Sequence, residues 1–233
     1  MTRNLTRQKI KAVIFDLDDT LYPEHEYVSC AYRDIARMVS EDYGNNPDDI
    51  YQKLMFFRYH CGDDVVFQNL MVYIGQPQHS SNEYIHSKLV PAYRNCSCNL
   101  CLFDDAKDLL DALEGKFMLG LITNGGSSTQ RNKLKLLNIE DRFDSIVITG
   151  ELFQREFWKP SIEPYVYCLR QLGVKPEESV YVGNNPVYDV EGASALDMRV
   201  FIRAEKQVAE EKASFTSYVL LQNLMELLNH IET

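Results

Sequence analysis

Residues 12–20 read AVIFDLDDT, and this stretch sets how the rest of the chain is interpreted. Its first part, Ala12–Leu17, is a short apolar run that predicts a buried strand. Alternation along the strand places Asp16 and Asp18 on the same side. Two like charges held that close repel each other unless a cation or a proton lies between them. The stretch therefore predicts a metal site or an acid–base pair, and a solvated turn after a strand is the alternative.

Further apolar runs of strand length occur along the chain, and turn-forming residues stop several of them. These runs are Lys116–Thr123, Phe143–Thr149, Ser179–Gly183 and Arg199–Arg203. Helical periodicity occurs at Asp104–Leu113, Ser127–Leu137, Glu163–Leu172, Asp189–Leu196 and Gln222–Ile231. This alternation predicts an α/β fold with a Rossmann-like parallel sheet core and helices on both faces. Such sheets bind ligands beyond the carboxyl ends of their strands.

Residues 22–99 break the alternation, because they lack a clear buried strand. Helical periodicity is present instead at Ser29–Asp42 and Ile50–His60. We therefore expect a core built from residues 1–21 and 100–233, with a mostly helical insert over 22–99.

Composition limits the partners. The chain of 233 residues is 45% hydrophobic and 25% charged, as in ordinary globular proteins. Its formal net charge of −10 disfavours nucleic acid and anionic membrane surfaces, so neither is expected as a partner. No apolar run has the length of a membrane span, and residues 1–11 lack the apolar region of a secretory signal, so we expect a cytoplasmic protein. Composition carries no information on the oligomeric state.

Six cysteines are present, and in a cytoplasmic chain they are expected to be reduced thiols. Cys96, Cys98 and Cys101 form a C-x-C-x-x-C cluster, which suggests a zinc or redox site. A structural zinc site needs four ligands, and the nearest extra candidate, His86, is not at the usual spacing. We therefore favour the interpretation of the cluster as small residues without a metal.

Polar residues follow the other predicted strands. Thr123 and Asn124 supply a hydroxyl, an amide and N–H groups that suit a phosphoryl oxygen, and a helix cap is the alternative. Lys159 could neutralise a nucleophile and a phosphate, although a surface lysine is the ordinary reading. Asn184 and Asp189 offer oxygens to a hard cation such as Mg²⁺, unless they form only a turn and a cap.

In this order the four groups resemble the motifs of the haloacid dehalogenase superfamily. Those motifs are D-x-D-x-T, then Thr or Ser, then Lys, then G-D-x-x-x-D or G-D-x-x-x-x-D. The resemblance spans residues 16–189 and draws in nearly the whole chain. It implies a phosphatase-type hydrolase with Mg²⁺ as cofactor, a small phosphorylated metabolite as substrate and a helical cap at residues 22–99.

The resemblance also implies a role for each residue. Asp16 would be the nucleophile that forms an aspartyl-phosphate. Asp18 would protonate the leaving oxygen and then activate water, which favours a phosphatase over a dehalogenase. Thr123 and Asn124 would bind the phosphoryl group, and Lys159 would bind it and hold Asp16 in place.

Magnesium would be held by Asp16, the Asp18 carbonyl, Asn184 and Asp189. The family usually has Asp where this chain has Asn184. One unit charge about 4 Å from an ion is worth up to ~4 kcal/mol at an effective dielectric near 20, and relaxation recovers part of that. The first hypothesis is an active phosphatase. The second is a degenerate member that binds a phosphorylated ligand or partner with little turnover, and a phosphoryl-transferring mutase is a third, weaker option.

Overall fold

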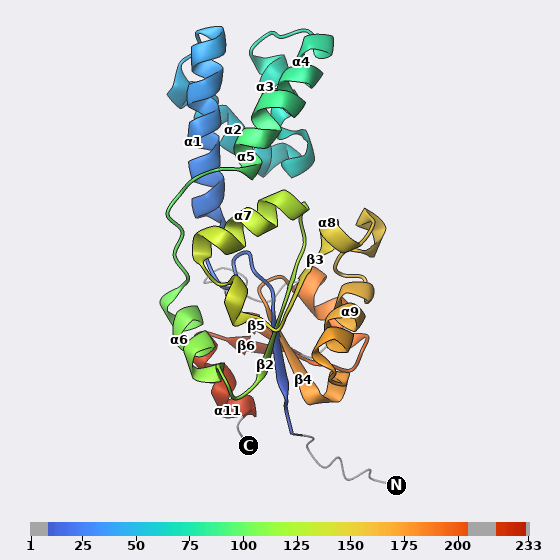
Figure 1. Ribbon diagram of the computed structural model, residues 1–233. Coiled ribbons are helices and arrows are strands. Elements are labelled where there is room, and N and C mark those ends of the chain that lie inside the picture. The colour runs from blue at the N-terminus through green and yellow to red at the C-terminus, as the bar shows by residue number, and fades with distance from the viewer. Residues whose placement is uncertain (1–8, 205–217, 232–233) are drawn as a thin grey trace. The chain divides into compact units, whose positions relative to one another are not determined.

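The computed structural model describes residues 9–204 and 218–231, and within them the run at the start of the chain is a central strand of a sheet. The sheet has the strand order β3-β2-β1-β4-β5-β6 (Figure 1). Its strands are β1 (Ala12–Phe15), β2 (Met118–Thr123), β3 (Ser145–Ile148), β4 (Ser179–Gly183), β5 (Arg199–Arg203) and β6 (Val219–Leu221). Every neighbouring pair is parallel, so the predicted parallel α/β sheet is confirmed.

The observed strands match the predicted runs, although several are shorter. The strand predicted over residues 12–17 ends at Phe15, and the chain then turns through Asp19, whose φ of 55° is left-handed. Short polar side chains such as Asp adopt that conformation more readily than most residues. Strand β6 was not predicted, because three residues at the edge of a sheet give too short a pattern to recognise.

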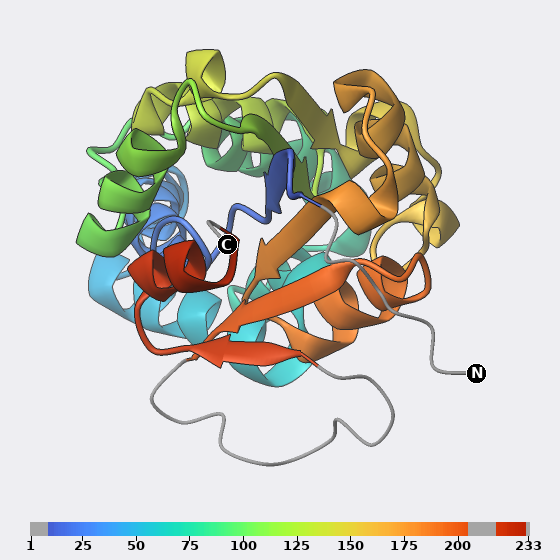
Figure 2. The same ribbon diagram turned by 90° about the horizontal axis from the view of Figure 1, so that it is seen from below.

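Helices cover both faces of the sheet, as predicted. Figure 2 shows α6 (green) and α11 (red) on one face and α9 (orange) on the other. The helices that accompany the sheet are α6 (Asp104–Leu113), α7 (Ser127–Leu137), α8 (Thr149–Leu152), α9 (Glu163–Leu172), α10 (Glu191–Ser194) and α11 (Leu228–Ile231). Short 3₁₀ turns lie at Glu140–Arg142, Arg155–Phe157, Pro176–Glu178 and Leu224–Leu227.

One predicted helix begins earlier than expected. The helix predicted over residues 189–196 is a π-helical turn at Pro186–Val190 followed by α10. The side chain of Asn185 accepts hydrogen bonds from the backbone N–H groups of Val187 and Tyr188 and so caps the turn. The turn therefore begins at Pro186, three residues before Asp189. The helix predicted over residues 222–231 likewise begins as a 3₁₀ turn, capped by Asn223.

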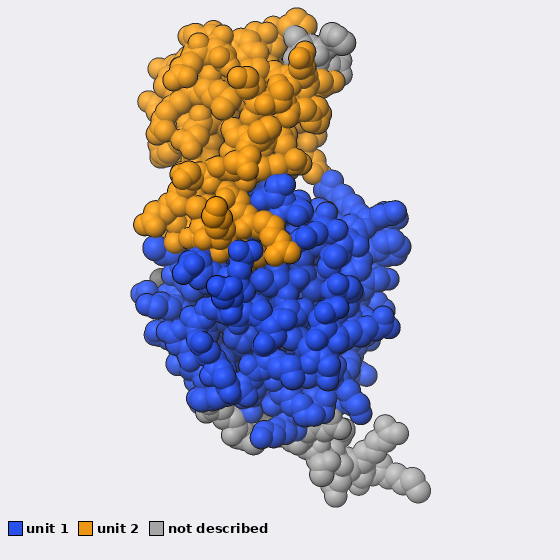
Figure 3. Space-filling model, viewed as in Figure 1, with its two compact units in different colours: residues 1–23, 101–130, 137–233 blue, residues 24–100, 131–136 orange. Residues whose placement is uncertain are grey.

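The chain divides into two compact units (Figure 3). Unit 1 holds the sheet and comprises residues 9–23, 101–130, 137–204 and 218–231 of the described chain. Unit 2 comprises residues 24–100 and 131–136, so it includes part of α7.

Unit 2 is helical. Its helices are α1 (Glu24–Tyr43), α2 (Pro47–Cys61), α3 (Val66–Tyr73), α4 (Gln78–Tyr84) and α5 (Val90–Arg94), with a 3₁₀ turn at Asp63–Val65 and a π-helical turn at Ile85–Leu89. It has its own apolar core, to which α1 contributes Ile35 and Val39 and α2 contributes Ile50 and Leu54. None of the described helices is long and apolar enough to cross a membrane.

Gly120 sets how closely α9 packs on strand β2. A Cβ atom at this position would lie 2.8 Å from the Cys168 sulfur and 3.1 Å from Ile14. The surrounding core is fully buried, with Tyr165 and Cys168 inaccessible to solvent. Protein cores are close-packed, so one methyl group here has no space.

We therefore expect Gly120→Ala to lower the free energy of unfolding by about 1–3 kcal/mol, the usual cost of overpacking. Urea unfolding of the purified protein measures this change. Gly126→Ala is the matched control, because its added Cβ meets no atom within 4 Å. Adding Cys168→Ala to Gly120→Ala should recover part of the loss, and a Gly120→Ala variant as stable as the Gly126→Ala control would contradict the packing argument.

Candidate active site

The predicted site residues meet at the carboxyl ends of three adjacent strands. Asp16 follows β1 directly, and its N–H donates to the Val182 carbonyl of β4 at 2.9 Å. Thr123 is the last residue of β2, and Asn184 follows β4. Because β2, β1 and β4 are neighbours in the sheet, residues separated by more than 160 positions in the chain come together at one edge.

Lys159 bridges two of the carboxylates. It lies just before α9 in the chain and is 4% exposed, and its ammonium is 2.5 Å from Asp16 Oδ1 and 2.8 Å from Asp189 Oδ1. Burial alone would lower the pKa of Lys159, but the charges of Asp16 and Asp189 hold it above its ordinary value. The lysine is therefore a permanent positive charge inside the site, and the reading of Lys159 as a surface lysine is wrong.

Each oxygen of the Asp189 carboxylate accepts two hydrogen bonds. Oδ1 accepts from Lys159 and from the Tyr181 hydroxyl at 3.0 Å, and Oδ2 accepts the N–H groups of Asn184 at 3.1 Å and Asn185 at 2.9 Å. Gly183 makes this possible, because a Cβ there would overlap the Asp189 carboxyl group. Asp189 thereby fixes both the lysine and the backbone that carries Asn184.

Tyr181 was not among the predicted site residues. Its hydroxyl accepts from Lys159 at 3.0 Å and donates to Asp189. Burial raises the pKa of Tyr181 well above its ordinary value, so the hydroxyl stays protonated. Its sequence signal is a tyrosine in a mostly apolar strand, and tyrosine is too common in strands for that signal to be recognised.

Asp18 is held by two neutral donors. The Tyr22 hydroxyl donates to its Oδ1 at 2.6 Å, and the Gln130 amide donates to its Oδ2 at 2.8 Å. The same amide nitrogen lies 2.5 Å from the Thr123 hydroxyl oxygen. Gln130 is 2% exposed and joins two predicted site residues, yet nothing in the sequence distinguishes it from a surface residue near the start of a helix.

The Thr20 hydroxyl contacts both Asp16 and Asn184. It is 3.3 Å from Asp16 Oδ2 and 3.5 Å from Asn184 Oδ1. Thr20 thereby links the amide oxygen of Asn184 to the Asp16 oxygen that does not contact Lys159.

Asn124 makes a contact that the sequence did not predict. Its amide nitrogen donates to the Lys159 carbonyl at 2.9 Å, and its amide oxygen accepts the Lys159 N–H at 3.0 Å. The side chain thus positions the lysine backbone. The predicted role in binding substrate stays a prediction, and it now rests on the backbone N–H of Asn124.

Charged side chains of both signs meet at this edge of the sheet: the carboxylates of Asp16, Asp18 and Asp189 and the ammonium of Lys159. Burial raises the pKa of Asp16 to about 7, with Lys159 opposing the rise and the charges of Asp189 and Asp18 adding to it. A further cation would favour the ionised carboxylate.

The carboxylate and amide oxygens of this site suit magnesium, which prefers oxygen ligands and keeps several water molecules in its shell. Asp16 Oδ2 and Asn184 Oδ1 lie on the same side of the site, next to Thr20. Asp189 already has both oxygens engaged by protein donors, so its contacts favour an indirect role through the Asn184 backbone.

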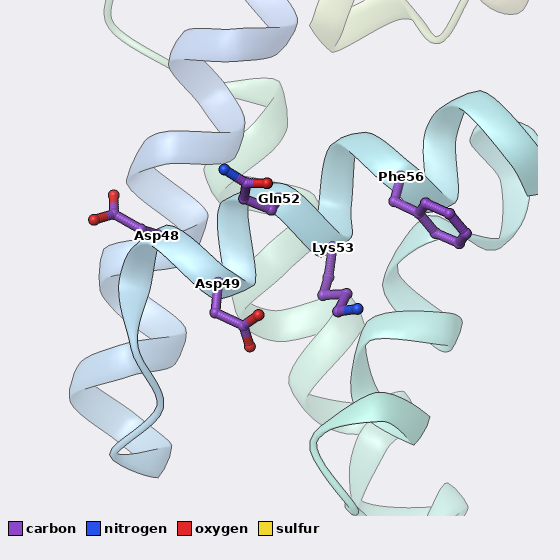
Figure 4. A pocket seen from close by; sticks show the side chains of 5 residues that line it. All are labelled: Asp48, Asp49, Gln52, Lys53 and Phe56. Atoms are coloured by element: carbon purple, nitrogen blue, oxygen red, sulfur yellow. The ribbon is translucent and has the colours of Figure 1, made fainter.

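A separate surface hollow of about 360 Å³ lies along α2 in unit 2. It is lined by Asp48, Asp49, Gln52, Lys53 and Phe56 (Figure 4). It contains none of the predicted site residues, and its mixed, open lining defines no ligand chemistry.

Comparison with known proteins places the chain in a family. A model of haloacid dehalogenase-like hydrolases matches residues 13–202. A glyceraldehyde 3-phosphate phosphatase from Methanopyrus kandleri is 32% identical over 196 residues, which are 81% of this chain and 82% of that protein. An N-acylneuraminate-9-phosphatase from Homo sapiens is 31% identical over 130 residues, which are 55% of this chain and 51% of that protein.

A solved structure supports the same fold. The hydrolase YfnB from Bacillus subtilis, crystallised with magnesium, has a TM-score of 0.71 and 19% identity, with 97% of this chain and 100% of that chain covered. The chain belongs to the haloacid dehalogenase-like hydrolases and is a phosphoric monoester hydrolase within that family, as the sequence predicted.

We expect Lys159→Met to lower the free energy of unfolding by about 3–5 kcal/mol at neutral pH, because it leaves Asp16 and Asp189 buried without their cation. Urea unfolding measures the loss. Lys107→Met, at an exposed position of α6 in the same unit, is the matched control and should change stability by less than about 0.5 kcal/mol. Equal effects of the two substitutions would show that the buried bridge is not a structural requirement.

Proposed function

We propose that the chain is a magnesium-dependent phosphatase that hydrolyses a small phosphorylated metabolite through an aspartyl-phosphate. The observation that carries this proposal is the pairing of two differently held carboxylates. Asp16 is buried against the Lys159 ammonium, and the two oxygens of Asp18 accept from the Tyr22 hydroxyl and the Gln130 amide. Two carboxyl groups in different environments suit two different chemical roles.

Asp16 is the proposed nucleophile. Lys159 holds its Oδ1 and thereby fixes the carboxylate that would attack a phosphorus atom. The ester oxygen then leaves as the phosphorus binds to Asp16, and covalent catalysis divides the hydrolysis into two easier steps. Magnesium, when bound by Asp16, the Asp18 carbonyl and Asn184, with Asp189 behind them, would neutralise charge on the phosphoryl oxygens.

Asp18 is the proposed acid and base. In the first step it gives a proton to the leaving oxygen, and in the second it takes a proton from the water that attacks the aspartyl-phosphate. Gln130 and Tyr22 donate to its two oxygens and thereby fix the direction of the carboxyl group. Thr123, tied to the same Gln130 amide, is the proposed donor to a phosphoryl oxygen.

The relatives and unit 2 support the substrate class. Glyceraldehyde 3-phosphate and N-acylneuraminate 9-phosphate, the compounds in the relatives' names, are small phosphorylated metabolites. We propose that residues 22–99 act as a cap that closes over such a substrate and excludes water. The separate core of unit 2, residues 24–100 and 131–136, supports its movement as one body. A cytoplasmic location stays a prediction from composition.

Asn184 favours one alternative. Its neutral amide oxygen lies 3.5 Å from the Thr20 hydroxyl, at a position where the family usually has a carboxylate. A weaker magnesium site would leave a protein that binds a phosphorylated ligand or partner with little turnover. The intact Asp16, Asp18, Thr123 and Lys159 favour the active enzyme.

We expect Asp16→Asn and Asp18→Asn to fail at different steps. With p-nitrophenyl phosphate and Mg²⁺, Asp16→Asn should release no nitrophenolate, because the amide cannot form the phosphoryl bond. Asp18→Asn should release about one equivalent in a burst and then turn over slowly, because nitrophenolate leaves without a proton but water attack needs the base. Rapid-mixing absorbance measurements separate the two phases.

Asp19→Asn is the matched control, because it removes a neighbouring carboxylate and Asn tolerates the left-handed φ of 55°. It should keep turnover within a few-fold of the wild type. A burst from the Asp16→Asn variant would rule out Asp16 as the nucleophile.

We expect Asn184→Asp to lower the Mg²⁺ concentration for half-maximal activity by about 10- to 100-fold, because it adds a charge beside the ion. A magnesium titration of turnover measures the shift. Asn185→Asp is the matched control, since Asp caps the following turn as well as Asn does and adds the same charge one residue away.

The same titration separates the two functions. Turnover by the wild type supports the phosphatase. An inactive wild type that Asn184→Asp alone revives would establish the degenerate binding protein instead.

A further inference from the structure

Three cysteines of unit 2 that are far apart in the sequence come together in the fold. Cys30 lies on α1, and Cys96 and Cys98 follow α5, yet the three sulfur atoms all lie within 4.8 Å of one another. Cys101, the last member of the C-x-C-x-x-C cluster, is exposed and belongs to unit 1. The third member of the spatial cluster is therefore Cys30 and not Cys101, and the sequence pattern did not connect Cys30 with the other two cysteines.

The spacing of the sulfur atoms fits a thiophilic ion. Zinc binds thiolates at about 2.3 Å, and tetrahedral geometry then separates the sulfurs by about 3.8 Å. Sulfurs within 4.8 Å of one another reach that separation by moves of about 1 Å or less. Side-chain rotation supplies such moves without a change in the backbone.

The segment that carries Cys96 and Cys98 is fixed within unit 2. The Tyr27 hydroxyl, from α1, donates to the Tyr93 carbonyl at 2.6 Å. The Asn132 amide donates to the Cys96 carbonyl at 2.8 Å, and the Cys30 thiol donates to the Ser97 carbonyl at 3.8 Å. These contacts hold the C-x-C segment against α1, so the sulfur cluster is built before any ligand arrives.

We propose that Cys30, Cys96 and Cys98 form a three-thiolate site for a soft d¹⁰ cation such as Zn²⁺. Thiolates select such ions, whereas the oxygen ligands proposed for the active site select magnesium. Cys96 is 3% exposed while Cys30 and Cys98 are partly exposed, so an ion can enter from one side. The cluster holds three ligands among the described residues, and we therefore assign the fourth position to water.

A thiol–disulfide switch is the competing chemistry. One disulfide would join only two of the three sulfur atoms, whereas one metal ion would use all three, which lie within 4.8 Å of one another.

The test uses the full chain, purified with reductant and freed of metal. Zn²⁺ is titrated in competition with a chromophoric chelator, and Co²⁺ is added separately to look for the near-ultraviolet band of thiolate–cobalt charge transfer. The wild type should bind one equivalent and show the band. Cys30→Ser and Cys98→Ser should each weaken Zn²⁺ binding about a hundredfold or more, because two thiolates remain.

Cys61→Ser is the matched control, since Cys61 is an exposed thiol of the same unit outside the cluster. It should bind like the wild type, and circular dichroism checks the fold of each variant. Two variants are used so that the test does not depend on one that fails to fold. Cys98 is only partly buried, so its replacement by serine should be tolerated. Equal Zn²⁺ affinity in the Cys30→Ser, Cys98→Ser and Cys61→Ser variants would overturn the proposal. So would a wild type that binds no Zn²⁺ but forms a disulfide from Cys30 in air.

Discussion

The buried ammonium of Lys159 is the interaction on which the active site depends. Removing an ammonium and two carboxylates from water is costly, and the cost is offset only when the geometry is good and every remaining hydrogen-bonding position is filled. Here Lys159 contacts Asp16, Asp189 and the Tyr181 hydroxyl, and Asp189 also receives two backbone N–H groups. One side chain thereby ties the end of strand β1 to the end of strand β4.

Around this bridge, the proposed reactive groups are held by neighbouring side chains. Gln130 and Tyr22 hold Asp18, Asn124 holds the backbone of Lys159, and Asp189 holds the loop that carries Asn184. Positioning matters because phosphoryl transfer is catalysed mainly by placement and charge neutralisation. In the proposed magnesium site, the contacts of Asp189 favour a supporting role that does not need direct contact with the ion.

The two units contain different kinds of polar side-chain clusters. Carboxylate and amide oxygens lie at the edge of the sheet in unit 1, whereas unit 2 has a cluster of cysteine sulfurs from α1 and from the segment after α5. Hard and soft ligands select different ions, so the two proposed sites would not compete for the same metal. Net charge and composition predict neither site, because each depends on a few residues.

The sequence by itself determined the sheet, the helical insert and the four motifs at the strand ends. Apolar runs and strand–helix alternation are local patterns, and the carboxyl ends of neighbouring parallel strands necessarily meet at one edge of the sheet. The motif order therefore predicts that Asp16, Thr123 and Asn184 lie together. Only the tertiary structure decided which residues hold them, such as Gln130 and Tyr181, and that Asn124 contacts the backbone of Lys159. It alone also showed that Cys30, and not Cys101, lies beside Cys96 and Cys98. Those contacts join side chains distant in the chain, and their existence depends on packing that no local pattern records.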